Sequence, residues 1–490
     1  MPPQSRLSPA VTQWLWGTAF ATVLLLLALT HIPQAALSFW WDELYTLVNY
    51  VEPGVFDAWT ADYHTNNHVL FSMLSAASGA ILGPGEVSYR LPSLGFVLAA
   101  YAGLMVQVNR HIGRVEALST GLILLFSPLL LYWVTQARGY GLTTFAAVLV
   151  LGGTLVLTSK RESVNRLAWA QVLLGGFVGI ATLPHFALLF TLSCLALAAV
   201  LRDRWRAVAG AWALVGTAAL LFYLPSGPVR IMRASGVDLG PPLSPGDTFT
   251  GPFRFQIVGT LKGAGDLGEL LSDRWIPVAV SVLVVFALLA LARAYIERDW
   301  APLVLTLIPI YGSYLVFFAL RLAVTDRSLL FLFPHLAVLL AFGIGYLMRA
   351  HGRQAAIRWL VLAPLMAAAV VMVLLTLKMA FAWAAIPIED YRGATAVATN
   401  SDVNVAVTDS SRSLGFSYYL PDIVVLDEAS LFGFICDGTE SAVYIAHSYK
   451  RPFDPPVDCL EDRAALRVDL RQRRRGTMSV WLVPEVSPGN

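Results

Sequence analysis

Long apolar runs recur along most of this 490-residue chain, and they constrain its fold more than any other feature. A run of roughly 17 to 25 apolar residues is long enough to cross a bilayer as a helix. By this criterion the chain has about eleven candidate spans, at residues 14–36, 88–108, 117–134, 139–158, 167–184, 186–201, 208–224, 276–295, 301–320, 329–348 and 358–380. Hydrophobic residues make up 57% of the chain and charged residues only 13%, too few to cover a soluble globule of this length. The sequence therefore predicts an α-helical, polytopic membrane protein.

The loops between these spans alternate in charge. Short basic stretches occur at Arg6 and at residues 110–114, 160–166, 202–206, 293–298 and 349–358. By the positive-inside rule these stretches are cytoplasmic, as is the N-terminus. The first span could instead be a cleaved signal peptide, but its apolar run is long and further spans follow it. We expect a transmembrane domain over residues 1–383, with outer loops at 37–87 and 225–275.

Two parts of the predicted outer face are organised. The stretch "HVLFSMLSAASGAILG" in loop 37–87 is too short and too rich in small residues for a span, which favours a helix lying along the membrane interface. The tail, residues 384–490, contains the β-rich runs "VNVAVTD", "DIVVLDE", "SAVYIAH" and "MSVWLVPE", with a plausible helix at "SRSLGFSYYL". It is predicted to be a small extracytoplasmic α/β domain.

The chain has three cysteines, of which Cys436 and Cys459 lie in this tail. An oxidising outer compartment favours a disulfide between them, and two buried thiols are the alternative. Three cysteines offer no zinc-type spacing.

Charged and polar residues gather at the predicted outer ends of the spans. Asp42 and Glu43 are adjacent in "FWWDELYT", directly after the first span. An acid before a helix could simply be its N-cap. Four other segments of the same face add further polar groups, namely Asp62, His64, Asn66, Asn67, His68, Arg90, Gln136, Arg138, Asp326 and Arg327. Because ionisable groups beside apolar spans are costly and usually mark a pathway or a site, we expect one shared outer cavity.

The chemistry of such a cavity follows from its residue types. An ionised carboxylate can accept a proton from an attacking hydroxyl. Arginines can bind a phosphate through forked, charge-assisted hydrogen bonds. This combination suits the transfer of a sugar from a phosphate leaving group to an alcohol. A donor used at the outer face would have to arrive on a lipid, because nucleotide sugars are scarce there.

The order of these motifs resembles the bacterial branch of the C-type (GT-C) glycosyltransferases, which includes protein mannosyltransferase and aminoarabinose transferase relatives. The resemblance extends over roughly residues 14–380 and rests on "FWWDELYT", "NNHVLFSMLSAASGAILGPGEVSYRLPS", "YWVTQARGYGLTTFAAV", "TDRSLLFLFPHLAVLLA" and "IEDYRGATAVA". It implies a GT-C fold, a polyprenyl-phosphate-linked sugar donor, an inverting single displacement and a bacterial inner-membrane location. The acceptor would be a lipid, a protein or a glycan.

Carried over to this sequence, the resemblance implies that Asp42 is the catalytic base, with Glu43 supporting it or binding the acceptor. Arg138 and Arg327 become candidates for the donor phosphate, as does Arg90, which could equally be a structural partner for a carboxylate. The acceptor side is expected to include Asp62, His64, Asn67, His68, Gln136 and Tyr140.

Relatives commonly carry a Glu at the position of Gln136, so we expect that no metal or other cofactor is required. The net charge of +2 gives no sign of a nucleic-acid partner. Two other classes remain possible: a transporter or lipid flippase, in which charged residues mark a permeation path, and a non-catalytic scaffold that presents the tail domain. The nearly uncharged spans weigh against a transporter, and a scaffold predicts that Asp42→Asn is silent.

Overall fold

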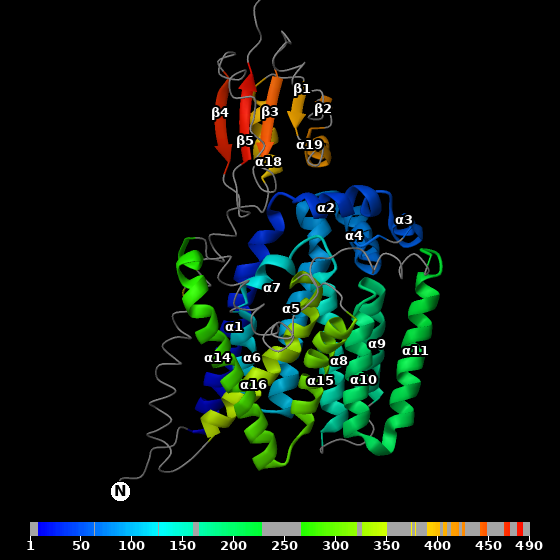
Figure 1. Cartoon of the computed structure of the whole chain (residues 1–490), viewed down its shortest axis with the longest axis vertical. Helices are drawn as coiled ribbons and strands as arrows, with labels where there is room; N and C mark the ends of the chain where they lie inside the picture. The colour runs from blue at the N-terminus through cyan, green and yellow to red at the C-terminus, as the bar shows by residue number, and fades with distance from the viewer. Residues whose placement is uncertain are drawn as a thin grey trace, which may run out of the picture.

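The structure consists of a bundle of helices with a small β-sheet at one end (Figure 1). The computed structural model describes residues 8–62, 64–125, 127–159, 166–227, 266–320, 326–349, 374, 378, 390–401, 405–408, 413–420, 424–426, 442–447, 465–470 and 478–483. The bundle contains α1 (Pro9–His31), α5 (Glu86–His111), α6 (Arg114–Leu125), α7 (Pro128–Trp133), α8 (Tyr140–Thr158), α9 (Arg166–Thr182), α10 (Phe186–Val200), α11 (Trp205–Tyr223), α14 (Asp266–Glu297), α15 (Ala301–Ala319) and α16 (Phe333–Arg349).

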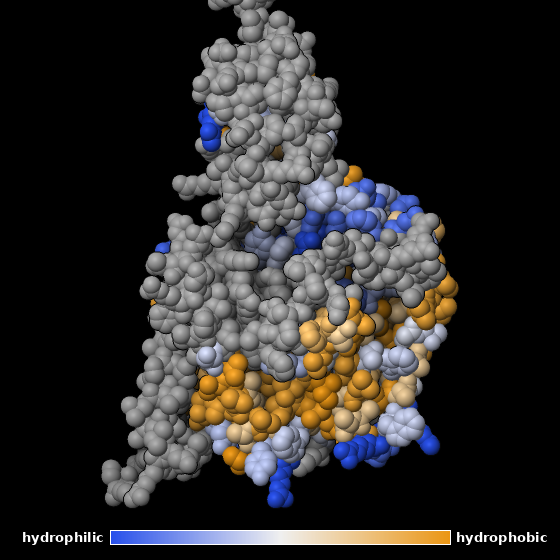
Figure 2. Space-filling model, in the orientation of Figure 1, coloured by the Kyte–Doolittle hydropathy of each residue, from blue (hydrophilic) through white to orange (hydrophobic). Residues whose placement is uncertain are grey.

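The helices have the length and composition of membrane spans. Within the described residues, six helical stretches are long and apolar enough to cross a bilayer, at residues 13–36, 86–111, 140–158, 202–223, 301–319 and 329–348. On the face seen in Figure 2, an apolar band lies between polar ends. The protein is therefore an integral membrane protein, but the expected count of eleven spans is not confirmed. Almost all of the last expected span, 358–380, lies outside the described residues.

The expected span at residues 117–134 is wrong in detail, because the chain forms two helices there. Helix α6 ends at Leu125 and α7 begins at Pro128. The Ser127 side chain accepts a hydrogen bond from the backbone N–H of Leu130 at 3.3 Å, which caps α7. Proline fits the first position of a helix, since its missing N–H would have no partner there. This break turns the chain toward the "TQAR" segment that follows α7.

Helix α8 lies at the centre of the bundle and is almost entirely buried. It packs closely on α9, where a Cβ added at Gly175 would lie 2.7 Å from the carbonyl oxygen of Ala146. Small residues that allow backbones to approach in this way are typical of membrane helix pairs. Elsewhere in the bundle, Glu116 of α6 and Arg293 of α14 form a buried ion pair of 2.6 Å.

Short helices cover the end of the bundle that faces the sheet (Figure 1). They are the 3₁₀ turn η1 (Ile32–Ala36), α2 (Trp41–Thr46), the π-helical turn η2 (Leu47–Val51), α3 (Val55–Thr60) and α4 (Val69–Leu82). Helix α4 has 14 residues, too few to span a bilayer. Phe56 of α3 and Ile81 of α4 are exposed, as expected for helices whose apolar side contacts lipid.

The described residues of the tail form a five-stranded mixed sheet in the order β2-β1-β3-β5-β4. Its elements are α18 (Tyr391–Thr399), β1 (Val405–Thr408), α19 (Ser413–Tyr419), β2 (Val424–Leu426), β3 (Ala442–His447), β4 (Leu466–Leu470) and β5 (Met478–Val483). β1 pairs in parallel with β2 and β3, while β5 pairs antiparallel with β3 and β4. Strand β4 and helix α18 were not predicted. The predicted disulfide, Cys436–Cys459, falls outside the described residues and stays a prediction.

The sheet domain packs directly on one end of the bundle. Tyr391 of α18 and Phe416 of α19 belong to one buried cluster with Phe39 and Leu44, which flank Asp42 in the sequence. The Tyr419 hydroxyl accepts a hydrogen bond from the backbone N–H of Phe39 at 2.9 Å. The segment that carries the two adjacent acids is therefore held between the bundle and the sheet domain.

Candidate active site

The two acids occupy the first turn of α2. Trp40, in an extended conformation, is the N-cap, so Asp42 lies inside the helix and does not cap it. Carboxylates in a first helical turn are stabilised by the helix dipole. The Glu43 carboxylate also accepts a hydrogen bond from the backbone N–H of Trp40 at 3.2 Å. This N–H group has no acceptor within the helix, because it lies at the helix start. Although adjacent, the two side chains have different partners.

Glu43 is fully buried and forms an ion pair with buried Arg90 of α5. Two guanidinium nitrogens of Arg90 contact the two carboxylate oxygens, at 2.8 and 2.5 Å. The backbone N–H of Ala137 donates to the same carboxylate at 2.5 Å. Arg90 also donates to backbone carbonyls of residues 34, 35, 37 and 38. This pair therefore joins α5, the end of η1, α2 and the "TQAR" segment.

Asp42 faces two other arginines. Its carboxylate lies 3.2 Å from Nη1 of Arg138, which follows α7, and it forms an ion pair with Arg327 of the 3₁₀ segment η4 (Asp326–Leu332). Arg138 is 2% exposed, whereas Arg327 is 30% exposed in its side chain. Three segments distant in the sequence thus bring one carboxylate and two guanidinium groups together at the sheet-domain end of the bundle.

Aromatic rings orient Arg327. Its guanidinium carbon lies 6.0 Å from the ring centroid of Trp40 and 5.4 Å from that of Trp133. Such cation–π contacts favour a guanidinium that is partly removed from water. The Trp40 indole N–H donates to the side chain of Gln136 at 3.0 Å, so the tryptophan is itself fixed.

His68 adds a further donor beside Arg138. The backbone N–H of Gly139 donates to Nδ1 of His68 at 2.7 Å, an approach that a Cβ on residue 139, 2.9 Å from Nδ1, would obstruct. We therefore assign the proton of the neutral ring to Nε2. Nε2 lies 3.2 Å from Nη2 of Arg138, which donates to Oδ1 of Asn66. These two neighbouring donors would both be satisfied by one anionic oxygen bound beside them.

Burial lowers the pKa of His68 well below its ordinary value of 6.5, and the charges of Arg138, His185 and Arg327 lower it further. His68 therefore stays neutral in the folded protein while the unfolded chain takes up a proton below about pH 6.5. The contribution of His68 to stability is complete above pH 6.5 and is lost as the pH falls toward its folded pKa.

We expect His68→Gln to flatten this pH dependence. A glutamine can still accept the N–H of Gly139 but does not titrate, so the free energy of unfolding should fall less steeply below pH 6.5, by up to about 1.4 kcal/mol per pH unit. Chemical unfolding in detergent at several pH values measures the slope. Burial and the charge of Arg138 also lower the pKa of His64, but less, so His64→Gln is the comparison variant and should flatten the slope less than His68→Gln does. Equal slopes for wild type and His68→Gln would contradict the assignment.

The other candidate residues fall into two groups. Asn67, Gln136 and Tyr140 are buried near Arg138, and the Tyr140 ring centroid lies 5.6 Å from its guanidinium carbon. Asn67 Oδ1 is buried and has no hydrogen-bond partner among the residues that the structure describes. Asp62 and His64 are exposed, and His64 stacks on Tyr45 with ring centroids 5.2 Å apart.

Some contacts of the site were not predicted from the sequence. The backbone N–H groups of Ala137 and Gly139 donate to Glu43 and His68, respectively, and the Trp133 ring lies against the guanidinium group of Arg327. Contacts made by backbone N–H groups cannot be predicted from the sequence, because every residue except proline has such a group. No group of three or more His, Cys, Asp or Glu side chains suited to a metal ion occurs among the residues that the structure describes.

Comparison with known proteins identifies the fold. No protein-family model and no curated protein matches the sequence. Among solved structures, the chain is similar to ArnT from Cupriavidus metallidurans in the apo state, with a TM-score of 0.58 at 14% identity over 96% of this chain and 98% of that one. The undecaprenyl phosphate complex of ArnT gives a TM-score of 0.55 at 15% identity over the same shares.

A second protein shares this architecture. The archaeal oligosaccharyltransferase AglB from Archaeoglobus fulgidus, in complex with an inhibitory peptide and a dolichol-phosphate, has a TM-score of 0.51 at 12% identity. The match covers 88% of this chain and 69% of AglB. The chain therefore has the GT-C fold, and the resemblance found in its motifs is confirmed at the level of fold.

Proposed function

We propose that this protein is a bacterial inner-membrane glycosyltransferase that moves a sugar from a polyprenyl-phosphate-linked donor to a hydroxyl acceptor at the outer face. The observation that carries the proposal is the Asp42 carboxylate held between Arg138 and Arg327 at the sheet-domain end of the bundle. The fold supports it, because ArnT and AglB have been solved with undecaprenyl phosphate and dolichol-phosphate, respectively. In this orientation the N-terminus is cytoplasmic and the sheet domain extracytoplasmic.

The reaction would be an inverting single displacement. The acceptor oxygen forms a bond to the anomeric carbon while the bond from that carbon to the phosphate oxygen breaks. Asp42 accepts the acceptor's hydroxyl proton, and polyprenyl phosphate leaves with the electron pair and one additional negative charge. Arg138 and Arg327 stabilise this charge as it develops, which is the largest catalytic contribution in many enzymes.

Donor binding would also release the base. Arg138 and Arg327 contact Asp42 in this structure, and a phosphate can compete for both guanidinium groups through charge-assisted hydrogen bonds. The N–H at Nε2 of His68, 3.2 Å from Arg138, would bind the same phosphate. Once the arginines bind the donor, the Asp42 carboxylate becomes available to the acceptor hydroxyl.

The remaining candidates take supporting roles. Arg90 and Glu43 form a buried ion pair with each other, so we assign them to positioning α2 rather than to phosphate binding. Exposed Asp62 and His64 would face the acceptor. Asn67, Gln136 and Tyr140 would shape the wall around Arg138, and they are candidates for acceptor contacts. None of the proposed steps uses a metal ion.

We expect Arg327→Gln to lower kcat/KM for a lipid-linked donor by about 10²-fold or more, because removing one charged donor from a developing anion costs that much in other enzymes. Arg327→Lys should restore only part of the loss, since an ammonium group cannot form the forked contact. Initial rates with purified protein and a defined polyprenyl-phosphate sugar measure this.

Arg204→Gln, which alters an exposed arginine of the η3 turn (Arg202–Arg204), should behave as wild type. If Arg327→Gln and Arg204→Gln had the same kcat/KM, phosphate binding by Arg327 would be ruled out.

A further inference from the structure

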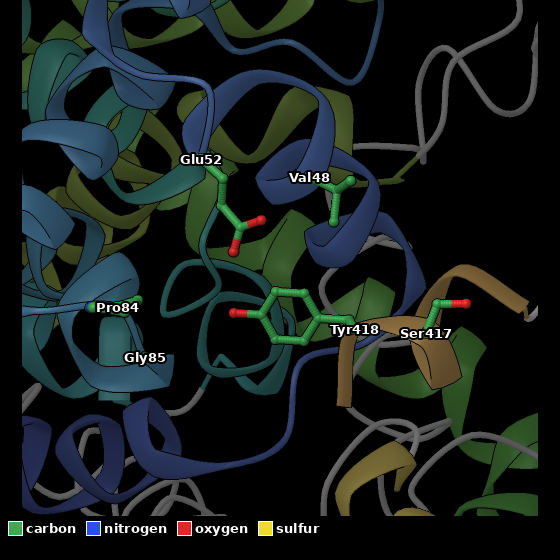
Figure 3. A pocket seen from close by; sticks show the side chains of 6 residues that line it. All are labelled: Val48, Glu52, Pro84, Gly85, Ser417 and Tyr418. Carbon is green, nitrogen blue, oxygen red and sulfur yellow. The ribbon is translucent and has the colours of Figure 1, made fainter. Parts of the chain in front are cut away.

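An open cavity of about 560 Å³ lies between the sheet domain and the outer end of the bundle (Figure 3). Its described lining comes from three parts of the chain, namely Val48 and Glu52 at η2, Pro84 and Gly85 between α4 and α5, and Ser417 and Tyr418 on α19. The hydrogen bonds and ion pairs described above for Asp42, Arg138 and Arg327 involve none of these residues. The cavity is therefore separate from the candidate reaction centre.

The lining combines one carboxylate, two hydroxyl groups and apolar ring surfaces. Figure 3 shows the Glu52 carboxylate and the Tyr418 hydroxyl extending into the cavity. Pro84 and Gly85 lie on one side of it, and Val48 and Ser417 lie on the other. Among the described lining residues there is no lysine, arginine or histidine. These six described residues offer hydrogen-bond acceptors and a ring face, and the Glu52 carboxylate disfavours a ligand that carries a phosphate or a carboxylate at this position.

Glu52 and Tyr418 form a linked pair across the domain boundary. Burial raises the pKa of Glu52, and a hydrogen bond from Tyr418 opposes this shift. The Tyr418 ring is held by an edge contact to Phe39, with ring centroids 6.0 Å apart, and by another to Tyr419 at 5.1 Å. Tyr419 is in turn fixed by Phe39 and Glu86. Fixed side chains of this kind provide a pre-organised binding surface.

The position of the cavity suggests which part of a substrate it would hold. Val48 and Glu52 follow Asp42 by six and ten residues on the helical stretch that begins at Trp41. At a rise of at most about 1.5 Å per residue, since the π-helical turn η2 is wider and shorter than an α-helix, they lie up to roughly 9 and 15 Å further along it. A group bound here is too far from Asp42 to react but close enough to belong to the same extended acceptor.

We propose that this cavity is a subsite for a saccharide unit of the acceptor that carries no negative charge. Sugar hydroxyls would donate to Glu52 and exchange hydrogen bonds with Tyr418 and Ser417, and the apolar face of the ring would pack on the Tyr418 ring and Pro84. This assignment rests on the proposed function for the identity of the ligand as acceptor. It specifies a glycan-bearing acceptor and excludes anionic sugars at this position.

Saturation-transfer NMR on the full-length protein in nanodiscs tests the subsite without requiring turnover. The probes are maltotriose and methyl mannoside as neutral saccharides, glucosamine as a cationic one, and glucuronic acid and glucose phosphate as anionic ones. We expect signals from neutral or amino-bearing saccharides and much weaker signals from the anionic ones. Glu52→Gln and Tyr418→Phe should each weaken binding by about tenfold, the value of one charge-assisted hydrogen bond.

Two further variants test whether a change in saccharide binding arises in this cavity. Asp57→Asn removes an exposed carboxylate of α3 that does not line the cavity and should bind as wild type. Ser417→Trp leaves Glu52 in place, fills the cavity from its exposed rim and should abolish binding. Thermal unfolding of every variant confirms that it is folded.

Two results would overturn the subsite. One is that the Glu52 and Ser417 substitutions do not weaken the binding of any saccharide in the panel. The other is that anionic sugars bind as well as neutral ones. Asp42→Asn should still bind saccharide. Loss of transfer in that variant with binding retained supports both proposals. An active Asp42→Asn variant that still binds saccharide contradicts only the catalytic proposal.

Discussion

Replacing Asp42 by asparagine should lower kcat for sugar transfer by about 10² to 10⁴-fold, the contribution expected of a general base. The amide is nearly the same size as the carboxylate and can still accept hydrogen bonds from Arg138 and Arg327, but it cannot accept the acceptor's proton. Membranes with matched amounts of wild type and variant, supplied with extracted glycolipids and followed by mass spectrometry, measure the effect.

The matched control for this variant is Asp57→Asn. Asp57 also lies in the first turn of a short helix at the same end of the bundle, α3, but is exposed. The control should transfer sugar at the wild-type rate and unfold at the same temperature. If Asp42→Asn were as active as Asp57→Asn, Asp42 would be only a favourable charge in the first turn of a helix, and the mechanism would be wrong.

Replacing Arg90 by methionine should cost about 3–5 kcal/mol of stability, because it leaves the buried Glu43 carboxylate without its cation. Glu43 is fully buried and Arg90 is 4% exposed, so water cannot replace the lost contacts. Arg90 also donates to the carbonyl groups of Leu37 and Ser38, which would lose their partner. Unfolding in detergent, followed by circular dichroism at increasing denaturant, measures the change.

A second substitution tests whether the charge itself is the cause. Glu43→Gln combined with Arg90→Met removes both charges, and its cost should be smaller than the sum of the two single effects. Arg204→Ala breaks an ion pair that is exposed to solvent and should change stability by no more than about 1 kcal/mol. If Arg90→Met also lowered the free energy of unfolding by no more than about 1 kcal/mol, the buried pair would not hold α2 in place.

The gathering of Asp42, Arg138 and Arg327 could be predicted from the sequence because apolar spans fix sidedness. Each of these residues follows or precedes an apolar run at the end opposite to the basic loops. Counting spans therefore places them at one membrane surface, although they are separated by up to 285 positions. The motif order then predicts the GT-C fold, which the solved structures confirm.

Which arginine pairs with which acid could not be predicted. Asp42 and Glu43 are adjacent, and only the helical rotation of about 100° per residue directs one toward Arg138 and Arg327 and the other toward Arg90. The break between α6 and α7 was missed because the sequence is apolar on both sides of Ser127 and Pro128, so the two short helices have the composition of one span. Strand β4, "LRVDL", has a short pattern that only pairing with β5 stabilises.

The most direct test of the account is donor turnover by the purified protein in nanodiscs. A polyprenyl-phosphate sugar labelled in the sugar would be supplied together with a crude glycan acceptor fraction from the same membranes. The account predicts release of free polyprenyl phosphate in step with labelled product, inversion at the anomeric carbon, and loss of both products with Asp42→Asn. Labelled product formed from a nucleotide sugar without any polyprenyl intermediate, or formed equally by Asp42→Asn, would contradict it.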